Sequence, residues 1–245
     1  MPERETAINF HPETDRIQSE CGLFAMFIND PTSTDVRDVG FQAGEDLQHR
    51  AEGSAGMWIS NGESSDSVKE LGTVAVAFQE GRNLPFLENS NIVILHTRYP
   101  TAGGSNHKPN IQPLSLDGIT LGHHGNLTNA QEIADRIGYV PQGENSPDSD
   151  SWIALNAIVK EQGSTLAEKV INAQKGFEGG WAFIVSDGKT LVASRDPHGI
   201  RPLSVAVLGE KDDPKGCLLS VESCVFSNMG VSDFREVLPG ETITI

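Results

Sequence analysis

The order of apolar and polar positions along the chain predicts a strand-rich protein with a few helices. Short apolar runs bounded by turn residues are typical of buried strands. Asp187 and Gly188 separate two of these runs, and this pair is a strong signal for a tight hairpin turn. The runs that predict strands cover residues 21–28, 73–78, 91–97, 119–123, 181–186, 190–194, 203–207, 217–221 and 241–245.

Four other segments have the apolar spacing of helices. Thr32 and Asp35 form a capping box that predicts the start of the first helix. Thr128 and Gln131 form another, and Gly138 is expected to end the helix that follows. The predicted helices cover about residues 33–47, 129–137, 150–162 and 165–175.

The succession of these elements bears on the fold class. Strands come first, then helices are grouped between strands, and the regular strand–helix alternation of a parallel sheet is missing. This order favours antiparallel sheets with helices packed outside them, an α+β fold. Residues 1–20 are polar and without a clear period, so we interpret them as a leader or N-terminal arm.

Composition narrows the classes of function. The 245 residues are 37% hydrophobic, which allows a substantial core, and the net charge of −16 argues against binding nucleic-acid phosphates. No apolar run reaches the roughly 20 residues that span a bilayer, and the N-terminus lacks a secretory signal, so we expect a cytoplasmic protein without membrane contact. The three cysteines, Cys21, Cys217 and Cys224, form no metal-binding spacing, and we expect neither metal nor cofactor.

Several motifs occur in an order that resembles a known family. They are ECGLF at 20–24, LQHRAEGSAGM at 47–57, HTRYPTAGG at 96–104, LGHHGNLTNA at 121–130, SDSW at 149–152, RDPHGIRPL at 195–203 and VLPGE at 237–241. This series resembles the class II glutamine amidotransferases, and most of all the glutaminase half of the glutamine phosphoribosylpyrophosphate amidotransferase branch. The resemblance covers residues 21–245 and implies an N-terminal nucleophile hydrolase fold, a four-layer αββα sandwich of two antiparallel sheets.

In this family the nucleophile is a cysteine at the N-terminus, which corresponds to Cys21. An α-amine has a pKa close to that of a thiol, so an amine on the same residue can accept the thiol proton near neutral pH. That amine exists only if the bond between Glu20 and Cys21 is cut. The resemblance therefore implies that residues 1–20 are a propeptide, and the alternative is an arm that stays attached.

Other positions acquire roles from the same resemblance. Arg98 matches the residue that pairs with the α-carboxylate of glutamine, and a guanidinium can make two parallel bonds to a carboxylate. Asp150 matches the residue that holds the α-ammonium group, while Thr101 and Gly103 belong to the loop that closes over the substrate. Supporting roles are expected for Arg50, His96 and Asn126.

The oxyanion site contains a departure from the family pattern. Gly125 is expected to donate its backbone N–H to the oxyanion. The family has His-Asn-Gly-Asn here, and the side chain of its first Asn supplies the second donor, whereas this chain has His124 at that position. A histidine has a larger ring with a donor at a different reach. His124 therefore either replaces the amide, slows the reaction, or marks a domain that binds glutamine without hydrolysing it.

The expected reaction is hydrolysis of L-glutamine to L-glutamate and ammonia through a thioester on Cys21, as in the first step of purine biosynthesis. The alternative is a non-catalytic glutamine-binding regulatory or scaffold domain. No fingerprint of a phosphoribosyltransferase domain is found, and the sequence stops where the glutaminase half of the family normally ends. We therefore expect a partner that uses the ammonia, either a synthase or phosphoribosyltransferase subunit or a second copy of the chain.

Overall fold

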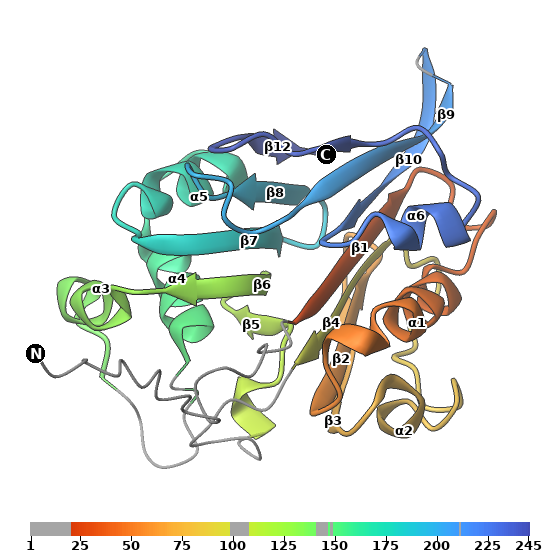
Figure 1. Ribbon diagram of the computed structural model, residues 1–245, viewed down its shortest axis with the longest axis horizontal. Helices are drawn as coiled ribbons and strands as arrows, with labels where there is room; N and C mark the ends of the chain where they lie inside the picture. Colours follow the sequence, from red (N-terminus) through yellow and green to blue (C-terminus); the bar gives the residue numbers. More distant parts are fainter. Residues whose placement is uncertain (1–20, 99–107, 141–146, 148, 211) are drawn as a thin grey trace, which may run out of the picture.

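The computed structural model describes residues 21–98, 108–140, 147, 149–210 and 212–245. Two antiparallel sheets face each other, and helices cover the outer side of each (Figure 1). The seven-stranded sheet has the order β11 (Arg235–Glu236), β9 (Ser204–Glu210), β10 (Asp213–Ser220), β1 (Gly22–Ile28), β4 (Ile92–Arg98), β2 (Ser54–Ser60), β3 (Ser65–Leu71). The five-stranded sheet has the order β12 (Thr242–Thr244), β8 (Leu191–Arg195), β7 (Gly179–Ser186), β6 (Ile119–Leu127), β5 (Leu114–Leu116).

The helices divide between the two outer faces. The seven-stranded sheet is flanked by α1 (Val36–Asp46), α2 (Val74–Ala77) and α6 (Cys224–Asn228). The five-stranded sheet is covered by α3 (Ala130–Ile137), α4 (Asp150–Lys160) and α5 (Leu166–Gln174) (Figure 1). Two short 3₁₀ turns, Gln48–Arg50 and Lys108–Asn110, complete the regular structure of the described residues. The α+β sandwich expected from the sequence is thus confirmed.

Two hydrophobic cores hold the layers together, and β7 contributes to both. Its residues Ala182 and Ile184 pack into the core shared by the two sheets and α1, whereas Trp181, Phe183 and Val185 pack under α3, α4 and α5. Successive side chains of a strand point to opposite faces, so a strand covered on both sides needs apolar residues at every position. This explains why β7 appears in the sequence as a continuous apolar run.

One predicted strand is wrong. The segment 73–78 is expected to be extended, but it contains helix α2, with the Thr73 hydroxyl accepting from the backbone N–H of Val76. A short apolar run has no periodicity that separates a strand from one turn of helix, so the threonine cap decides the outcome. The two strands before α2, β2 and β3, were not predicted from the sequence.

Local signals at the helix ends are accurate in part. Gly138 ends α3 in the left-handed conformation at φ 62°, as expected. The capping box predicted at Thr128 and Gln131 is wrong, because the N-cap of α3 is Asn129 and its side chain makes no capping hydrogen bond. Helix α5 lies within its predicted range, and Thr165 caps it through the N–H of Glu168. The cap of α1 is Asp35 and not Thr32, because the Asp35 carboxylate accepts from the N–H of Arg37 at 2.9 Å. Helix α1 therefore begins three residues later than predicted.

A bilayer-spanning helix is not found within the described ranges, where every helix is too short or too polar to cross the hydrocarbon layer.

Candidate functional site

Cys21 lies immediately before β1, a central strand of the seven-stranded sheet, and is half-buried. The N–H of the next residue, Gly22, donates to Thr97 Oγ1 on β4 at 3.1 Å. A side chain at position 22 would place its Cβ 2.5 Å from that oxygen and 2.9 Å from Leu47 Cβ, so only glycine fits. The close approach fixes the direction in which the chain enters β1 and therefore the position of Cys21.

Arg50 connects Cys21 to the other sheet. It ends the 3₁₀ turn after α1, and its Nε donates to the carbonyl oxygen of Cys21 at 3.1 Å. One terminal nitrogen pairs with the carboxylate of Glu222, and the other lies 3.5 Å from Nε2 of His124 on β6. The supporting role expected for Arg50 thus has a geometric basis. Glu222, which follows β10, was not among the predicted site residues.

His123 and His124 point to opposite faces of β6. His123 lies under the helical layer, with Nδ1 2.9 Å from Ser151 Oγ on α4, whereas His124 faces the other sheet and Arg50. Each residue is 1% exposed. Burial, followed by the positive charge of Arg50 and then the neighbouring rings of His123 and His96, holds the pKa of His124 well below its ordinary value. The ring of His124 is therefore neutral at neutral pH.

Gly125 follows His124 and has a backbone conformation that other residues rarely adopt. Its φ is +145°, and a Cβ at this position would lie 2.2 Å from the carbonyl oxygen of Gly180 and 2.9 Å from Trp181 Cα on β7. The Cβ-free backbone therefore allows β6 and β7 to approach each other closely. Asn126, expected to support the site, is exposed and pairs with Gly180 in the same ladder.

His96, from β4 of the other sheet, and Gln112, from the segment before β5, both bind β6 at His123. His96 Nε2 donates to the carbonyl oxygen of His123 at 3.1 Å, and Gln112 exchanges hydrogen bonds with the N–H (2.6 Å) and the carbonyl (3.2 Å) of the same residue. The Gln112 amide also donates to Ser151 Oγ at 3.2 Å. Burial lowers the pKa of His96 to about 3, so this ring is neutral. Both side chains position β6 at the residue before His124.

Asp150 begins α4, close to the end of β6. Its carboxylate accepts from the N–H of Leu127 at 2.9 Å and from the N–H of Ser151 at 2.8 Å. A carboxylate in the first turn is favoured by the partial positive charge at a helix N-terminus. Ser149, the N-cap, accepts from the N–H of Trp152 and so orients the same turn. The two backbone donors hold Asp150 beside the strand that carries Gly125.

Arg98 is the last residue of β4 and lies in register with Ser54 of β2. Its carbonyl oxygen accepts from the N–H of Gly53 at 3.0 Å. The preceding residue, Thr97, binds the N–H of Gly22, so Arg98 belongs to the same end of the sheet as Cys21. Thr101 and Gly103, expected in the substrate loop, lie outside the described residues.

The motif RDPHGIRPL forms a turn that supports β7. The carboxylate of Asp196 is fully buried and accepts from the backbone N–H groups of His198, Ile200 and Arg201, each at 3.0 Å. Ile200 packs over Gly180: a Cβ added at Gly180 would lie 2.8 Å from the Cβ of Ile200. Because Gly180 in turn contacts Gly125, this turn supports the back of the candidate site.

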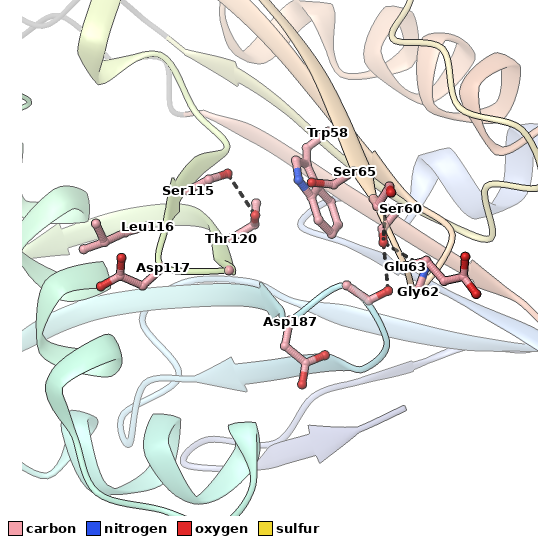
Figure 2. A pocket seen from close by; sticks show the side chains of 13 residues that line it. Trp58, Ser60, Gly62, Glu63, Ser65, Ser115, Leu116, Asp117, Thr120 and Asp187 are labelled. Carbon is pink, nitrogen blue, oxygen red and sulfur yellow. Dashed lines mark hydrogen bonds between the residues drawn. The ribbon is translucent and has the colours of Figure 1, made fainter.

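A separate cavity of about 360 Å³ lies at the opposite end of the space between the sheets (Figure 2). Three turns surround it: the β2–β3 turn, the β5–β6 turn and the β7–β8 turn. Ser60 closes one side through a 2.9 Å hydrogen bond to the carbonyl of Gly188. None of the predicted site residues that the structure describes lines this cavity.

The chain is similar in sequence and in fold to known proteins. A family model described as a glutamine amidotransferase domain matches residues 97–212. The amidophosphoribosyltransferase of Bacillus subtilis is 29% identical over 235 residues, which are 94% of this chain and 46% of the relative. A solved structure described as the allosteric regulatory enzyme of purine biosynthesis is 28% identical with a TM-score of 0.78, covering 92% of this chain and 47% of that one. The solved structure of glutamine phosphoribosylpyrophosphate amidotransferase from B. subtilis is 27% identical with a TM-score of 0.76. The match covers 92% of this chain and 47% of that one.

The chain shares the fold and the sequence motifs of the class II glutamine amidotransferases. It spans about half the length of the curated amidophosphoribosyltransferases that it matches. The αββα arrangement is accordingly the N-terminal nucleophile hydrolase fold of this family.

In this glutamine amidotransferase fold, residues far apart in the sequence meet at one end of the two sheets. Cys21, Arg50 and His124 form a connected group, and Arg98 belongs to the same end of the seven-stranded sheet as Cys21. Gly125 directly follows His124 on β6, and Asp150 binds the end of this strand. Within the described residues, no group of three or more His, Cys, Asp or Glu side chains is arranged to hold a metal ion.

Proposed function

We propose that this domain hydrolyses L-glutamine to L-glutamate and ammonia, with Cys21 as the nucleophile. One observation carries the proposal. Arg50 holds the carbonyl of Cys21 and at the same time contacts His124, so the start of β1 and the part of β6 that carries Gly125 lie on either side of one guanidinium. We infer that the thiol of Cys21 faces the backbone N–H of Gly125 across this space, as acyl transfer requires.

The reaction follows from the chemistry of a terminal cysteine. Once residues 1–20 are removed, the α-amine of Cys21 accepts the thiol proton, and the sulfur attacks the side-chain amide carbon of glutamine. The carbon–nitrogen bond breaks, ammonia leaves with that proton, and a thioester remains on Cys21. Water then attacks the thioester, which releases glutamate and returns the proton to sulfur. The backbone N–H of Gly125 is the proposed first donor to the oxyanion of both tetrahedral intermediates.

The substrate is recognised as a free amino acid. We propose that Arg98 pairs with its α-carboxylate and that Asp150 accepts from its α-ammonium group, with Thr101 and Gly103 in the covering loop. The carboxylate of Asp150 is already oriented by the N–H groups of Leu127 and Ser151. Two such fixed charges favour an amino acid over a simple amide.

Ammonia needs an acceptor that receives it before it is lost to water. The relatives named amidophosphoribosyltransferases are about twice as long as this chain. We propose that a phosphoribosyltransferase or other synthase subunit, or a second copy of the chain, provides the acceptor.

His124 supports one alternative, a glutamine-binding domain without turnover. The ring lies where the family carries an asparagine and is 1% exposed. Calorimetric binding of glutamine without any release of glutamate would favour this alternative over the enzyme.

The decisive test is replacement of the nucleophile. Cys21→Ala should lower glutamate release by a factor of roughly a thousand or more, because no other group can form the thioester. Cys224→Ala, an exposed thiol on α6, is the matched control and should retain full turnover. Intact mass should show loss of residues 1–20 and a glutamyl adduct on Cys21. Undiminished release by Cys21→Ala would overturn the proposal.

A further inference from the structure

The imidazole of His124, unlike an asparagine amide, has two nitrogens of which either can carry the hydrogen. A neutral imidazole has one N–H and one bare nitrogen, and its neighbours select between the two forms. The lowered pKa of His124, caused first by burial and then by the charge of Arg50, keeps the ring in the neutral state. A single N–H is therefore present, at either Nδ1 or Nε2.

Arg50 decides between the two tautomers. Its terminal nitrogen lies 3.5 Å from Nε2 of His124. A guanidinium has only hydrogens to offer and cannot accept, so Nε2 must present its lone pair. The hydrogen of the ring then resides on Nδ1.

Arg50 can impose this choice because it is itself held in place. Its Nε donates to the carbonyl of Cys21 at 3.1 Å, and its Nη1 pairs with the carboxylate of Glu222. The Arg50 side chain is only 13% exposed, so the pair with Glu222 is shielded from water on most sides. Glu222 is in turn fixed through its backbone N–H, which donates to Ser220 Oγ at 3.1 Å.

We infer that Glu222 and Arg50 lock His124 as the Nδ1–H tautomer and that this N–H is the second donor to the oxyanion. The inference rests on the proposed glutaminase function. Nδ1 of histidine and the amide nitrogen of asparagine are both bonded to Cγ, so they stand the same number of bonds from the backbone. The sequence predicted that a histidine donor would lie at a different distance from the backbone than the asparagine amide. That holds for a hydrogen on Nε2 but not for one on Nδ1. His124 then takes the place of the asparagine side-chain amide that serves as the second oxyanion donor in the family.

The tautomer is measured first, without reference to activity. A long-range ¹H–¹⁵N correlation spectrum of the full chain with ¹⁵N-labelled histidine distinguishes Nδ1–H from Nε2–H. The signals of His124 are identified by their loss in His124→Asn or His124→Gln. We expect the Nδ1–H pattern in the unaltered chain, and an Nε2–H pattern would overturn the inference.

Kinetics then test the donor. His124→Asn keeps a donor on the atom bonded to Cγ and should retain kcat within about tenfold, whereas His124→Gln moves the donor one bond outward and His124→Ala removes it. Both of these should lose roughly a hundred- to a thousandfold in kcat. Equal rates for the Asn and Gln variants would overturn the donor role, as would a large gain of His124→Asn over the unaltered chain.

Glu222 is a positioning residue, so its test needs a matched ion pair elsewhere. Glu222→Gln should lower kcat about tenfold with little change in KM, and should broaden or shift the His124 tautomer signals. Glu236→Gln, which removes the partner of Arg195 at 3.1 Å, is the control and should do neither. If Glu222→Gln behaves like this control, the locking role is wrong.

The outcomes separate this inference from the function on which it rests. If no form of the chain releases glutamate, the proposed function fails and the donor role fails with it, while the spectrum still decides the tautomer. If the unaltered chain turns over and His124→Gln is as active as His124→Asn, the function stands and the inference alone is rejected.

Discussion

The two ends of the space between the sheets are made from the same strands and differ sharply in their polar groups. At the far end, where turns surround the cavity of Figure 2, Ser60 Oγ is hydrogen-bonded to the carbonyl of Gly188 and receives the N–H of Gly62. At the site end, His96 Nδ1 and His123 Nε2 are buried without a hydrogen-bond partner among the described residues. A buried polar atom without a partner costs stability, so the structure holds these two rings in place at an energetic cost.

The glycines of the two ends should respond most differently to substitution. Gly125→Ala places a methyl group 2.2 Å from the Gly180 carbonyl at φ +145°, and should destabilise the protein by about 4 kcal/mol and abolish turnover. Gly118→Ala in the far-end turn also has a positive φ, +79°, but its Cβ meets nothing within 4 Å. We expect a cost there of about 1 kcal/mol, from backbone strain alone.

Urea unfolding of both variants measures this difference. If the two alanines destabilise equally, the close approach of β6 to β7 does not constrain the site end, and the contrast between the ends fails.

The hydrogen-bond anchors should differ next. Gln112→Leu deletes three buried hydrogen bonds, two to His123 and one to Ser151, and should cost about 3 kcal/mol because their partners stay buried. The variant should also lower kcat, since β6 loses its fixed position. Ser60→Ala also removes three hydrogen bonds, but only the one to Gly188 is buried, so it should cost about 1 kcal/mol and leave kcat unchanged. An unchanged kcat in Gln112→Leu would show that β6 needs no such anchor.

Sequence patterns predicted the parts of this molecule that depend on neighbours along the chain. The apolar run of β1, the extent of α5 and the left-handed end at Gly138 are each set by a few adjacent residues. The motif order also pointed to Cys21 and Asp150. Asp150 binds the end of β6 and Cys21 is joined to His124 through Arg50, while the roles of both residues stay predictions.

The remaining features depend on contacts that no local pattern contains. Glu222 and Arg50 are 172 positions apart in the sequence, so no local pattern at either residue predicts that they pair. Strand β2 was missed because Gly56 interrupts its apolar pattern. A Cβ there would lie 2.0 Å from the carbonyl oxygen of Gln112, so packing against a distant loop dictates the glycine. The tautomer of His124 likewise follows from Arg50, a neighbour 74 positions away in the sequence.

The acid response should also distinguish the two ends, by a small change in stability for each pH unit. The pKa of His96 in the folded protein is about 3, against 6.5 for the ordinary group, so between these values the unfolded chain binds a proton that the folded protein does not. Stability is therefore complete above pH 6.5 and falls as the pH drops towards 3, by about 1.4 kcal/mol per pH unit for this one ring.

The rings of His123 and His124 act in the same direction, since their pKa values are also lowered. Among the described residues, no histidine lines the far-end cavity. Urea unfolding at a series of pH values should give a slope in His96→Gln that is shallower by about one proton, because its amide can still donate to the His123 carbonyl. Identical slopes in the variant and the unaltered chain would mean that acid sensitivity does not originate in the neutral rings behind Cys21.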